Sequence, residues 1–161
     1  MLKYLLCLLM LTGLTLPAGA ETFANQAALE GLETAKAVFD VNQDDPDLLL
    51  LRLQLVDKTY QQLKDAGKNP QFVLTFRGGA SRFLTRGETY LEAGDEKTKA
   101  AVEELLVKFH AAGIPLEQCA IAAGLAKIKT DAFLDEVEVV ANGYTSMIAY
   151  QNKGYAFIPM E

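Results

Sequence analysis

The chain of 161 residues has no tryptophan, one histidine and only two cysteines. Two cysteines cannot build the disulfide framework that holds many small secreted domains together, and one histidine cannot supply a histidine-rich metal site. Basic residues are also few, and the net charge of −6 argues against binding to nucleic acid, whose phosphates attract a basic surface. Because 50% of the residues are hydrophobic and 22% are charged, the sequence predicts a folded domain with a substantial core and excludes disorder.

The N-terminal segment has the three parts of a secretory signal peptide. Lys3 supplies a positive charge, residues 5–16 form an apolar run, and Ala18-Gly19-Ala20 offers a small-residue cleavage site. The run is shorter than the roughly 20 residues that a transmembrane helix needs, so cleavage is preferred over an uncleaved anchor. We therefore expect residues 1–20 to be a signal peptide and residues 21–161 to form a single domain. In a bacterium this domain would be periplasmic, with no membrane contact in its mature form.

Short apolar strands alternate with amphipathic helices along the rest of the chain. Helical spacing of apolar residues covers 48–63, 97–112 and 144–152, with a short helix near 131–134, and alanines at helical spacing favour a further helix in 21–36. The strand-like segments are 37–41, 71–76, 114–119, 137–140 and 155–158, the last ended by Pro159. Strands separated by helices are typical of parallel sheets. We therefore predict an α/β fold, a three-layer, doubly wound, mostly parallel five-stranded sheet with helices on both faces.

Two features follow strands at the sheet edge where open α/β folds bind ligands. The first is the segment Arg77-Gly78-Gly79-Ala80-Ser81-Arg82. Paired glycines allow a ligand to approach the backbone closely, so Gly78, Gly79 and the two flanking arginines, Arg77 and Arg82, can hold a small anion. The segment matches neither the phosphate-loop nor the dinucleotide motif. A strand-to-helix turn with solvated arginines explains it equally well.

The second feature is Cys119, which ends a strand and precedes an alanine-rich segment, 120–123. If that segment is helical, its free N–H groups and its dipole favour a thiolate, the form of cysteine that attacks sulfur and other electrophiles. The alternative is a buried cysteine that only fills space. Cleavage of the signal peptide would remove Cys7, so Cys119 has no partner for an internal disulfide.

The remaining candidate groups are assigned structural roles. His110 lies near the end of its helix, where it complements the helix dipole. The acidic run 44–47 lacks the glycine and the distal glutamate of a calcium loop, so we expect it to cap a helix. Tyr144, Tyr150 and Tyr155 are expected in the core or in an interface. No ligand spacing indicates a metal site, and we predict neither a metal nor another cofactor.

The segment Cys119-Ala120-Ile121-Ala122-Ala123 resembles the cysteine segment of the DsrE/DsrF/TusD sulfur-relay family. Residues 137–159, and Ala112-Gly113-Ile114 before the cysteine strand, are similar to the corresponding parts of DsrE-like proteins. The resemblance implies a five-stranded parallel sheet, assembly into trimers or hexamers, and a persulfide carried by Cys119 between proteins. This chain differs from relay members in two ways. It has Ala126-Lys127-Ile128 where they often carry an Arg-Arg-Gly-like turn, and it is predicted to be exported, whereas they act in the cytoplasm.

The sequence therefore predicts an exported DsrE-like protein that handles sulfur through Cys119, as a sulfurtransferase-like carrier. The thiolate would take up an outer sulfur to form a persulfide, and a partner thiol would remove it, so one cysteine in this chain suffices. The partner is a sulfur donor or acceptor, either a protein or a small sulfur compound. The alternative is a non-catalytic binding or assembly module, in which the Arg77–Arg82 segment holds a small anion and Cys119 belongs to the core.

Overall fold

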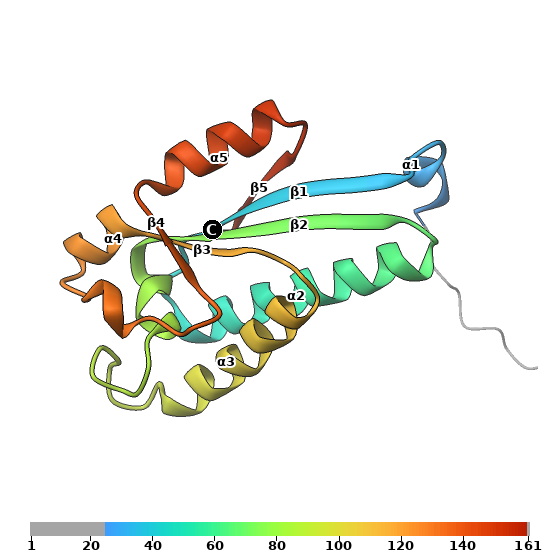
Figure 1. Ribbon diagram of the computed structural model, residues 1–161. Helices are drawn as coiled ribbons and strands as arrows, with labels where there is room; N and C mark the ends of the chain where they lie inside the picture. Colours follow the sequence, from blue (N-terminus) through green and yellow to red (C-terminus); the bar gives the residue numbers. More distant parts are fainter. Residues whose placement is uncertain (1–24, 161) are drawn as a thin grey trace, which may run out of the picture. The chain divides into compact units, whose positions relative to one another are not determined.

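The computed structural model describes residues 25–160 (Figure 1). The chain divides into two compact units, with the boundary between Glu30 and Gly31. The described part of the first unit contains one short helix, α1 (Gln26–Leu29), and the predicted signal peptide, 1–20, lies outside the described residues. The second unit contains the sheet and all the candidate site residues.

Five strands form a single sheet in the order β4-β3-β2-β1-β5. The strands are β1 (Thr34–Val41), β2 (Asn69–Phe76), β3 (Leu116–Cys119), β4 (Glu138–Val140) and β5 (Ala156–Met160). Every pairing is parallel, and the longest, between β1 and β2, joins eight residues of each strand from Thr34↔Asn69 to Val41↔Phe76. The predicted five-stranded α/β sheet is confirmed, and it is parallel throughout.

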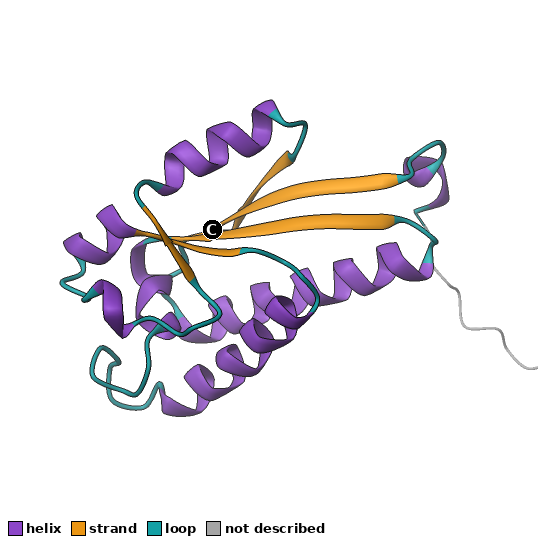
Figure 2. Cartoon of the chain, in the orientation of Figure 1, coloured by secondary structure: helices purple, strands orange, loops and turns teal. Residues whose placement is uncertain are grey.

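Helices cover both faces of this sheet (Figures 1 and 2). The chain runs from β1 to β2 through α2 (Pro46–Asp65) and from β2 to β3 through α3 (Glu96–Ala111), and both helices lie on one face. The connection from β4 to β5 returns across the sheet through α5 (Gly143–Asn152), which lies on the opposite face. The order of the strands reverses direction after β4, and this gives the doubly wound arrangement that was predicted.

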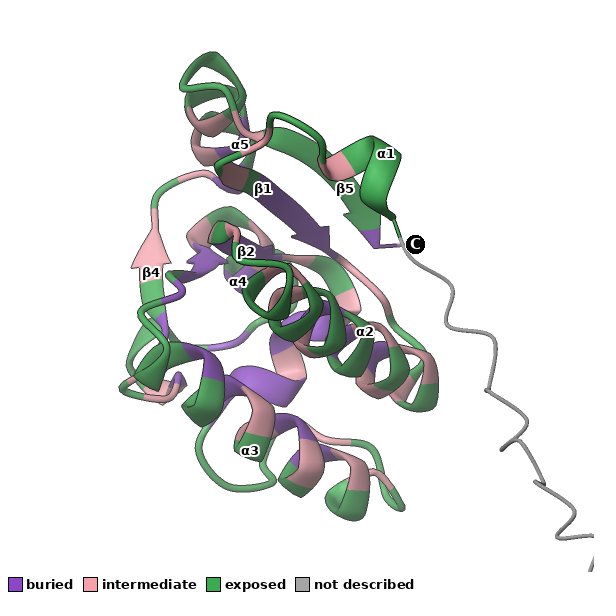
Figure 3. Ribbon diagram, turned by 90° about the vertical axis from the view of Figure 1, so that its right-hand side faces the viewer, coloured by how far each residue is buried: buried purple, intermediate pink, exposed green. Residues whose placement is uncertain are grey.

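The two faces of the sheet bury apolar clusters of different size. The face under α2 and α3 holds the main hydrophobic core, whose largest fully buried members include Phe76, Phe83 and Phe109. Figure 3 shows the later part of β1 buried and the outward sides of α2 and α3 exposed. The face under α5 has a small apolar cluster of Val38, Val73 and Met147.

Next to that cluster, the same face carries a row of buried polar residues. Side chains alternate along a strand, so Asp40 follows Val38 and Thr75 follows Val73 on the α5 side. Asp40 pairs in register with Thr75, and Thr75 pairs with Glu117, so the three residues cross the sheet side by side. All three are buried. This polar row crosses the sheet close to the carboxyl ends of β1, β2 and β3, where the candidate site lies.

Three predicted boundaries are wrong. Pro159 does not end the last strand but lies inside β5, an edge strand, where a residue without an N–H group is tolerated. The predicted helix in 21–36 is reduced, among the described residues, to the four residues of α1, since Thr34 already begins β1. The helix expected near 131–134 is a single 3₁₀ turn, Thr130–Ala132.

Helix capping by the acidic run is confirmed. Asp45 is the N-cap of α2, and its Oδ1 accepts a hydrogen bond of 2.8 Å from the N–H of Leu48. Pro46 occupies the first turn, where its missing N–H group costs nothing. Within residues 25–160, no helix combines the length and the apolar character that crossing a membrane requires.

Candidate functional site

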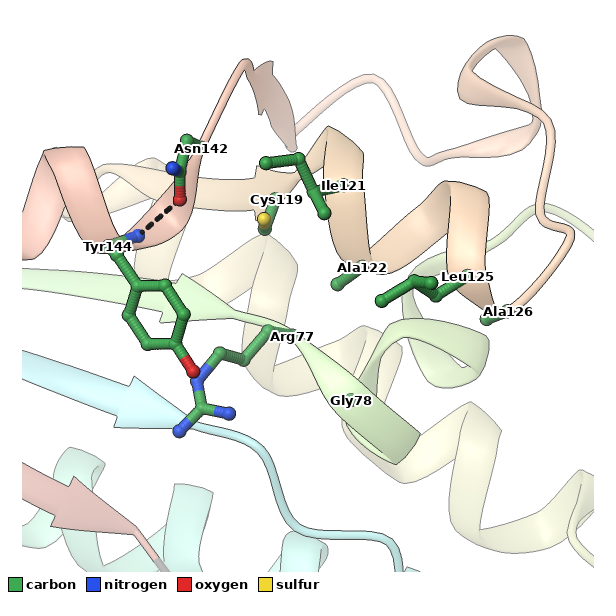
Figure 4. A pocket seen from close by; sticks show the side chains of 9 residues that line it. All are labelled: Arg77, Gly78, Cys119, Ile121, Ala122, Leu125, Ala126, Asn142 and Tyr144. Carbon is green, nitrogen blue, oxygen red and sulfur yellow. Dashed lines mark hydrogen bonds between the residues drawn. The ribbon is translucent and has the colours of Figure 1, made fainter.

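Cys119 is the last residue of β3 and directly precedes α4 (Ala120–Leu125), so the alanine-rich segment is helical. The residue is only 6% exposed, yet it lines a pocket of about 350 Å³. Figure 4 shows the sulfur between the side chains of α4 and Tyr144. Cys119 therefore exposes little surface, but it borders a cavity at the carboxyl edge of the sheet.

Three elements build the pocket wall around Cys119. Apolar side chains of α4 and of the residue after it form one side, Arg77 and Gly78 at the end of β2 form another, and Asn142 and Tyr144 at the start of α5 form the third (Figure 4). The members from α4 and its end are Ile121, Ala122, Leu125 and Ala126. The pocket thus combines a mainly apolar wall with one fixed cation.

Gly143 lets the start of α5 approach the cysteine. A Cβ atom added at Gly143 would lie 3.2 Å from the Cβ of Cys119, 3.7 Å from its Sγ and 3.0 Å from Cγ2 of Thr75. Asn142 caps the helix, because its Oδ1 accepts a hydrogen bond of 3.0 Å from the N–H of Tyr144. Gly143 therefore brings the first turn of α5, whose N–H groups carry partial positive charge, into contact with Cys119.

Arg77 is held in the pocket wall by Asp40. Its Nε and Nη2 donate hydrogen bonds of 2.7 Å to the two carboxylate oxygens of Asp40, a bidentate pair. This bonding raises the pKa of Arg77 above its ordinary value, with smaller contributions in the same direction from Tyr144 and Cys119. The guanidinium also lies 5.2 Å from the ring centroid of Tyr144. Arg77 therefore holds a permanent positive charge, paired with Asp40, in the wall of the pocket that Cys119 also lines, and Figure 4 shows the guanidinium below the ring of Tyr144.

The predicted anion segment is divided between two places. Arg77 and Gly78, whose φ is 58°, line the Cys119 pocket. Gly79 instead packs against the loop after β1, where an added Cβ would lie 1.9 Å from Oδ1 of Asp44. Arg82 donates 2.6 Å and 2.8 Å hydrogen bonds to Oδ1 and the carbonyl oxygen of Asp44. The structure thus brings Arg77 and Gly78 to Cys119 and places Gly79 and Arg82 against the acidic loop. Gly79 and Arg82 line a neighbouring pocket of about 250 Å³, and Gly78 lies between the two pockets and lines both.

A pair under α5, formed by the buried Glu117 and the half-buried Tyr150, was not indicated by the sequence patterns. Glu117 lies two residues before Cys119 on the same face of β3, and its Oε1 accepts a 2.8 Å hydrogen bond from the hydroxyl of Tyr150. Burial, followed by the bond to Glu117, raises the pKa of Tyr150 above its ordinary value. The pair ties the last turn of α5 to the strand that ends in the cysteine. The sequence did offer one indication of this contact, because Glu117 places a carboxylate within the strand-like segment 114–119.

The three tyrosines and the histidine considered in the sequence differ in how far they are buried. Tyr150 and Tyr155 pack against the apolar cluster under α5, in agreement with a core role. Tyr144 is not in the core, because it is 57% exposed. His110 is exposed in the last turn of α3, as predicted. Within residues 25–160, no group of three or more histidine, cysteine or acidic side chains is arranged to hold a metal ion.

A model of the DsrE/DsrF-like family matches residues 19–160. The chain belongs to the DsrE/DsrF-like family. The matched DsrE-like region includes every strand of the sheet and every residue of the Cys119 pocket.

Three similar proteins accompany this assignment. An uncharacterised protein of Aquifex aeolicus (strain VF5) is 33% identical over 125 residues, which are 77% of this DsrE-like chain and 55% of the relative, so the chain spans about half the length of that relative. Two solved structures share the fold. The protein of unknown function MTH1491 from Methanobacterium thermoautotrophicum has a TM-score of 0.59 at 22% identity, and the ychN protein from E. coli has a TM-score of 0.52 at 14% identity. Each alignment covers 78% of this chain and 98% of the other.

Proposed function

We propose that this DsrE-like protein carries sulfur as a persulfide on Cys119. The observation that supports the proposal is the position of Cys119 on the wall of a pocket, in contact with the start of α5, with Arg77 in the same wall. A persulfide ends in a negatively charged sulfur, which helix N–H groups and a nearby cation stabilise. Membership of the DsrE/DsrF-like family, which is related to sulfur relay, points to the same chemistry.

The transfer needs one cysteine in this chain and no external oxidant. The Cys119 thiolate attacks the outer sulfur of a donor persulfide or polysulfide, forming a bond to that sulfur, and the donor leaves as a thiolate or a shorter polysulfide with the bonding electron pair. An acceptor thiolate then attacks the terminal sulfur and releases the Cys119 thiolate. Each step moves one neutral sulfur atom, so electrons balance between donor and acceptor.

Intact mass measurement tests this proposal. Incubation of the protein with inorganic polysulfide is expected to add about 32 Da, one sulfur atom, and a reductant should remove it. The variant Cys119→Ser, in residues 21–161, should gain no reductant-sensitive mass. An unmodified thiol that also resists alkylation would overturn the proposal and favour a cysteine that only fills space.

We also propose that the protein is exported to the periplasm after cleavage at Ala20 and assembles as a trimer or hexamer. The charge and apolar pattern of residues 1–20 supports export. Apolar side chains that remain exposed on α2 and β5, including Leu51, Leu55 and Phe157, support assembly. N-terminal sequencing of periplasmic material should begin at Glu21, and sedimentation that detects only monomer would refute the assembly.

A further inference from the structure

Glu117 places an unpaired carboxylate oxygen on the same face of β3 as Cys119. The two residues are two positions apart on the strand, so both side chains face α5, and their Cα atoms are about 6.6 Å apart. Oε1 of Glu117 accepts the 2.8 Å hydrogen bond from Tyr150. Oε2 is also buried, and it has no hydrogen-bond partner among residues 25–160. Buried polar atoms are nearly always bonded, so this oxygen is available to a group that gives up a proton.

Thr75 connects this carboxylate with the surroundings of the cysteine. Thr75 is fully buried, and it pairs in register with Glu117. Its Cγ2 lies 3.0 Å from the position of an added Cβ at Gly143, and the Cβ of Cys119 lies 3.2 Å from the same position. The hydroxyl of Thr75 also has no partner within the described part of the chain. A hydroxyl both accepts and donates a hydrogen bond, so it can pass a proton from the thiol to the carboxylate.

The strands carry two other carboxylates on this face, and neither competes for the proton. Both oxygens of Asp40 accept hydrogen bonds of 2.7 Å from Arg77, whose guanidinium stays protonated. Glu138 pairs in register with Glu117, but it is exposed on the edge strand β4, where water solvates it. Asp40 is therefore occupied and Glu138 is solvated, which leaves Oε2 of Glu117 as the buried acceptor.

The remaining charged or titratable groups under and beside α5 are phenols and ammonium groups, which keep their protons at neutral pH. They are Tyr144, Tyr150 and Tyr155, together with Lys36 and Lys153 over the rings of Tyr155 and Tyr150. The histidine of the chain, His110, is exposed on α3, at the opposite face of the sheet. None of these groups can take the proton of the thiol.

We propose that Glu117 is the general base of Cys119 and that its Oε2 takes the proton of the thiol. This inference rests on the proposed function, since it adds a proton acceptor to that transfer. The S–H bond of Cys119 breaks, and its electron pair forms the bond to the outer sulfur of the donor. The donor leaves as a thiolate with the electron pair of the broken S–S bond, and Glu117 returns the proton to it. Tyr150 orients the base through the hydrogen bond to Oε1, as a third group orients the base in other nucleophilic sites.

The pH dependence of alkylation by iodoacetamide tests this assignment. The reagent is uncharged and its iodide leaves without a proton, so the rate reports how readily the thiol loses its own proton. Glu117→Gln keeps an oxygen for Tyr150 to bind. We expect this variant to react about tenfold more slowly than the wild type at about pH 6, and at nearly the wild-type rate at about pH 9.5, where hydroxide removes the proton.

Two results with Glu117→Gln would overturn the proposal. If Glu117 acted only as a negative charge, its removal would favour the thiolate, and the variant would react faster than the wild type at about pH 6. If the variant lost the same factor at both pH values, the change would lie in access to the sulfur rather than in proton transfer.

Two further variants act as controls. Asp57→Asn removes a carboxylate of α2 that pairs with Lys108, on the opposite face of the sheet, and it should react at the wild-type rate at both pH values. Tyr150→Phe keeps the carboxylate but releases its Oε1, so the rate should fall several-fold at about pH 6 and stay unchanged at about pH 9.5. This variant supplies the same test if Glu117→Gln does not fold, and an unchanged rate at about pH 6 would overturn the proposed arrangement.

The polysulfide experiment separates this proposal from the proposed function. Gain of one sulfur atom by Cys119, without an effect of Glu117→Gln on alkylation, would overturn the general base alone. A tenfold effect on alkylation in a protein that gains no sulfur would overturn only the proposed function.

Discussion

Replacing Gly143 by alanine tests the close contact between α5 and the cysteine. The new methyl group would lie 3.0 Å from Cγ2 of Thr75 and 3.2 Å from the Cβ of Cys119. Both distances are shorter than ordinary van der Waals contacts between carbon atoms, and both neighbours are buried on strands. The start of α5 must therefore move away from the sulfur, or the strands must shift.

The expected loss of stability follows from two opposed effects. Overpacking of a buried site costs about 1–3 kcal/mol. Replacing glycine by alanine in a helix returns about 0.4–1 kcal/mol by restricting the unfolded chain. We expect Gly143→Ala to lower the free energy of unfolding by about 1–2 kcal/mol, which corresponds to a decrease of about 3–8 °C in Tm for a domain of this size.

Gly124→Ala is the matched control. Gly124 lies in α4, and an added Cβ would meet nothing within 4 Å, so this change should raise the free energy of unfolding by about 0.5 kcal/mol. Urea unfolding and the rate of Cys119 with Ellman's reagent are measured for both variants. In Gly143→Ala the rate should also fall, because the positive end of α5 moves away. Unchanged stability in Gly143→Ala would refute the reasoning.

Three further changes probe polar contacts of the fold. Asp40→Asn removes the bidentate partner of Arg77 and should lower the free energy of unfolding in urea by about 2 kcal/mol. Tyr150→Phe should lower it by about 1–2 kcal/mol, because Glu117 loses its hydrogen bond. Since the pKa of Tyr150 is raised in the fold, its contribution is complete below the pKa of an unfolded tyrosine, about 10, and decreases at higher pH. Thermal melts between pH 8 and about 11 should show a smaller alkaline decrease in Tyr150→Phe. Asp45→Ala removes an N-cap and should lower Tm, through a loss of about 1 kcal/mol.

The fold class followed from local patterns, because the strands are apolar and the helices between them are amphipathic. The same patterns placed Arg77 and Cys119 at the carboxyl edge, since each stands where a strand ends. They could not place Asn142 and Gly143 at the cysteine. That contact depends on β4 lying next to β3, and the order of strands in a sheet is set by packing between distant segments.

The polar contacts between distant segments were missed for a similar reason. Asp40 is one charged residue inside the apolar strand β1, and its partner stands 37 positions later in the chain. The interpretation of Gly79 and Arg82 as ligand-binding groups did not anticipate that Asp44 approaches both of them. Each of these contacts joins residues that are far apart in the chain. The local sequence around either residue therefore does not predict the contact.

The proline in β5 has a consequence for the behaviour of the protein at high concentration. An outer strand of a sheet presents donors and acceptors to which a strand of another molecule can bind, and this is a common start of aggregation. Pro159 pairs in register with Asp40 of β1 and has no N–H group to offer on its outer side. The row of donors along β5 is therefore interrupted near its end, which hinders growth of the sheet from one molecule into the next.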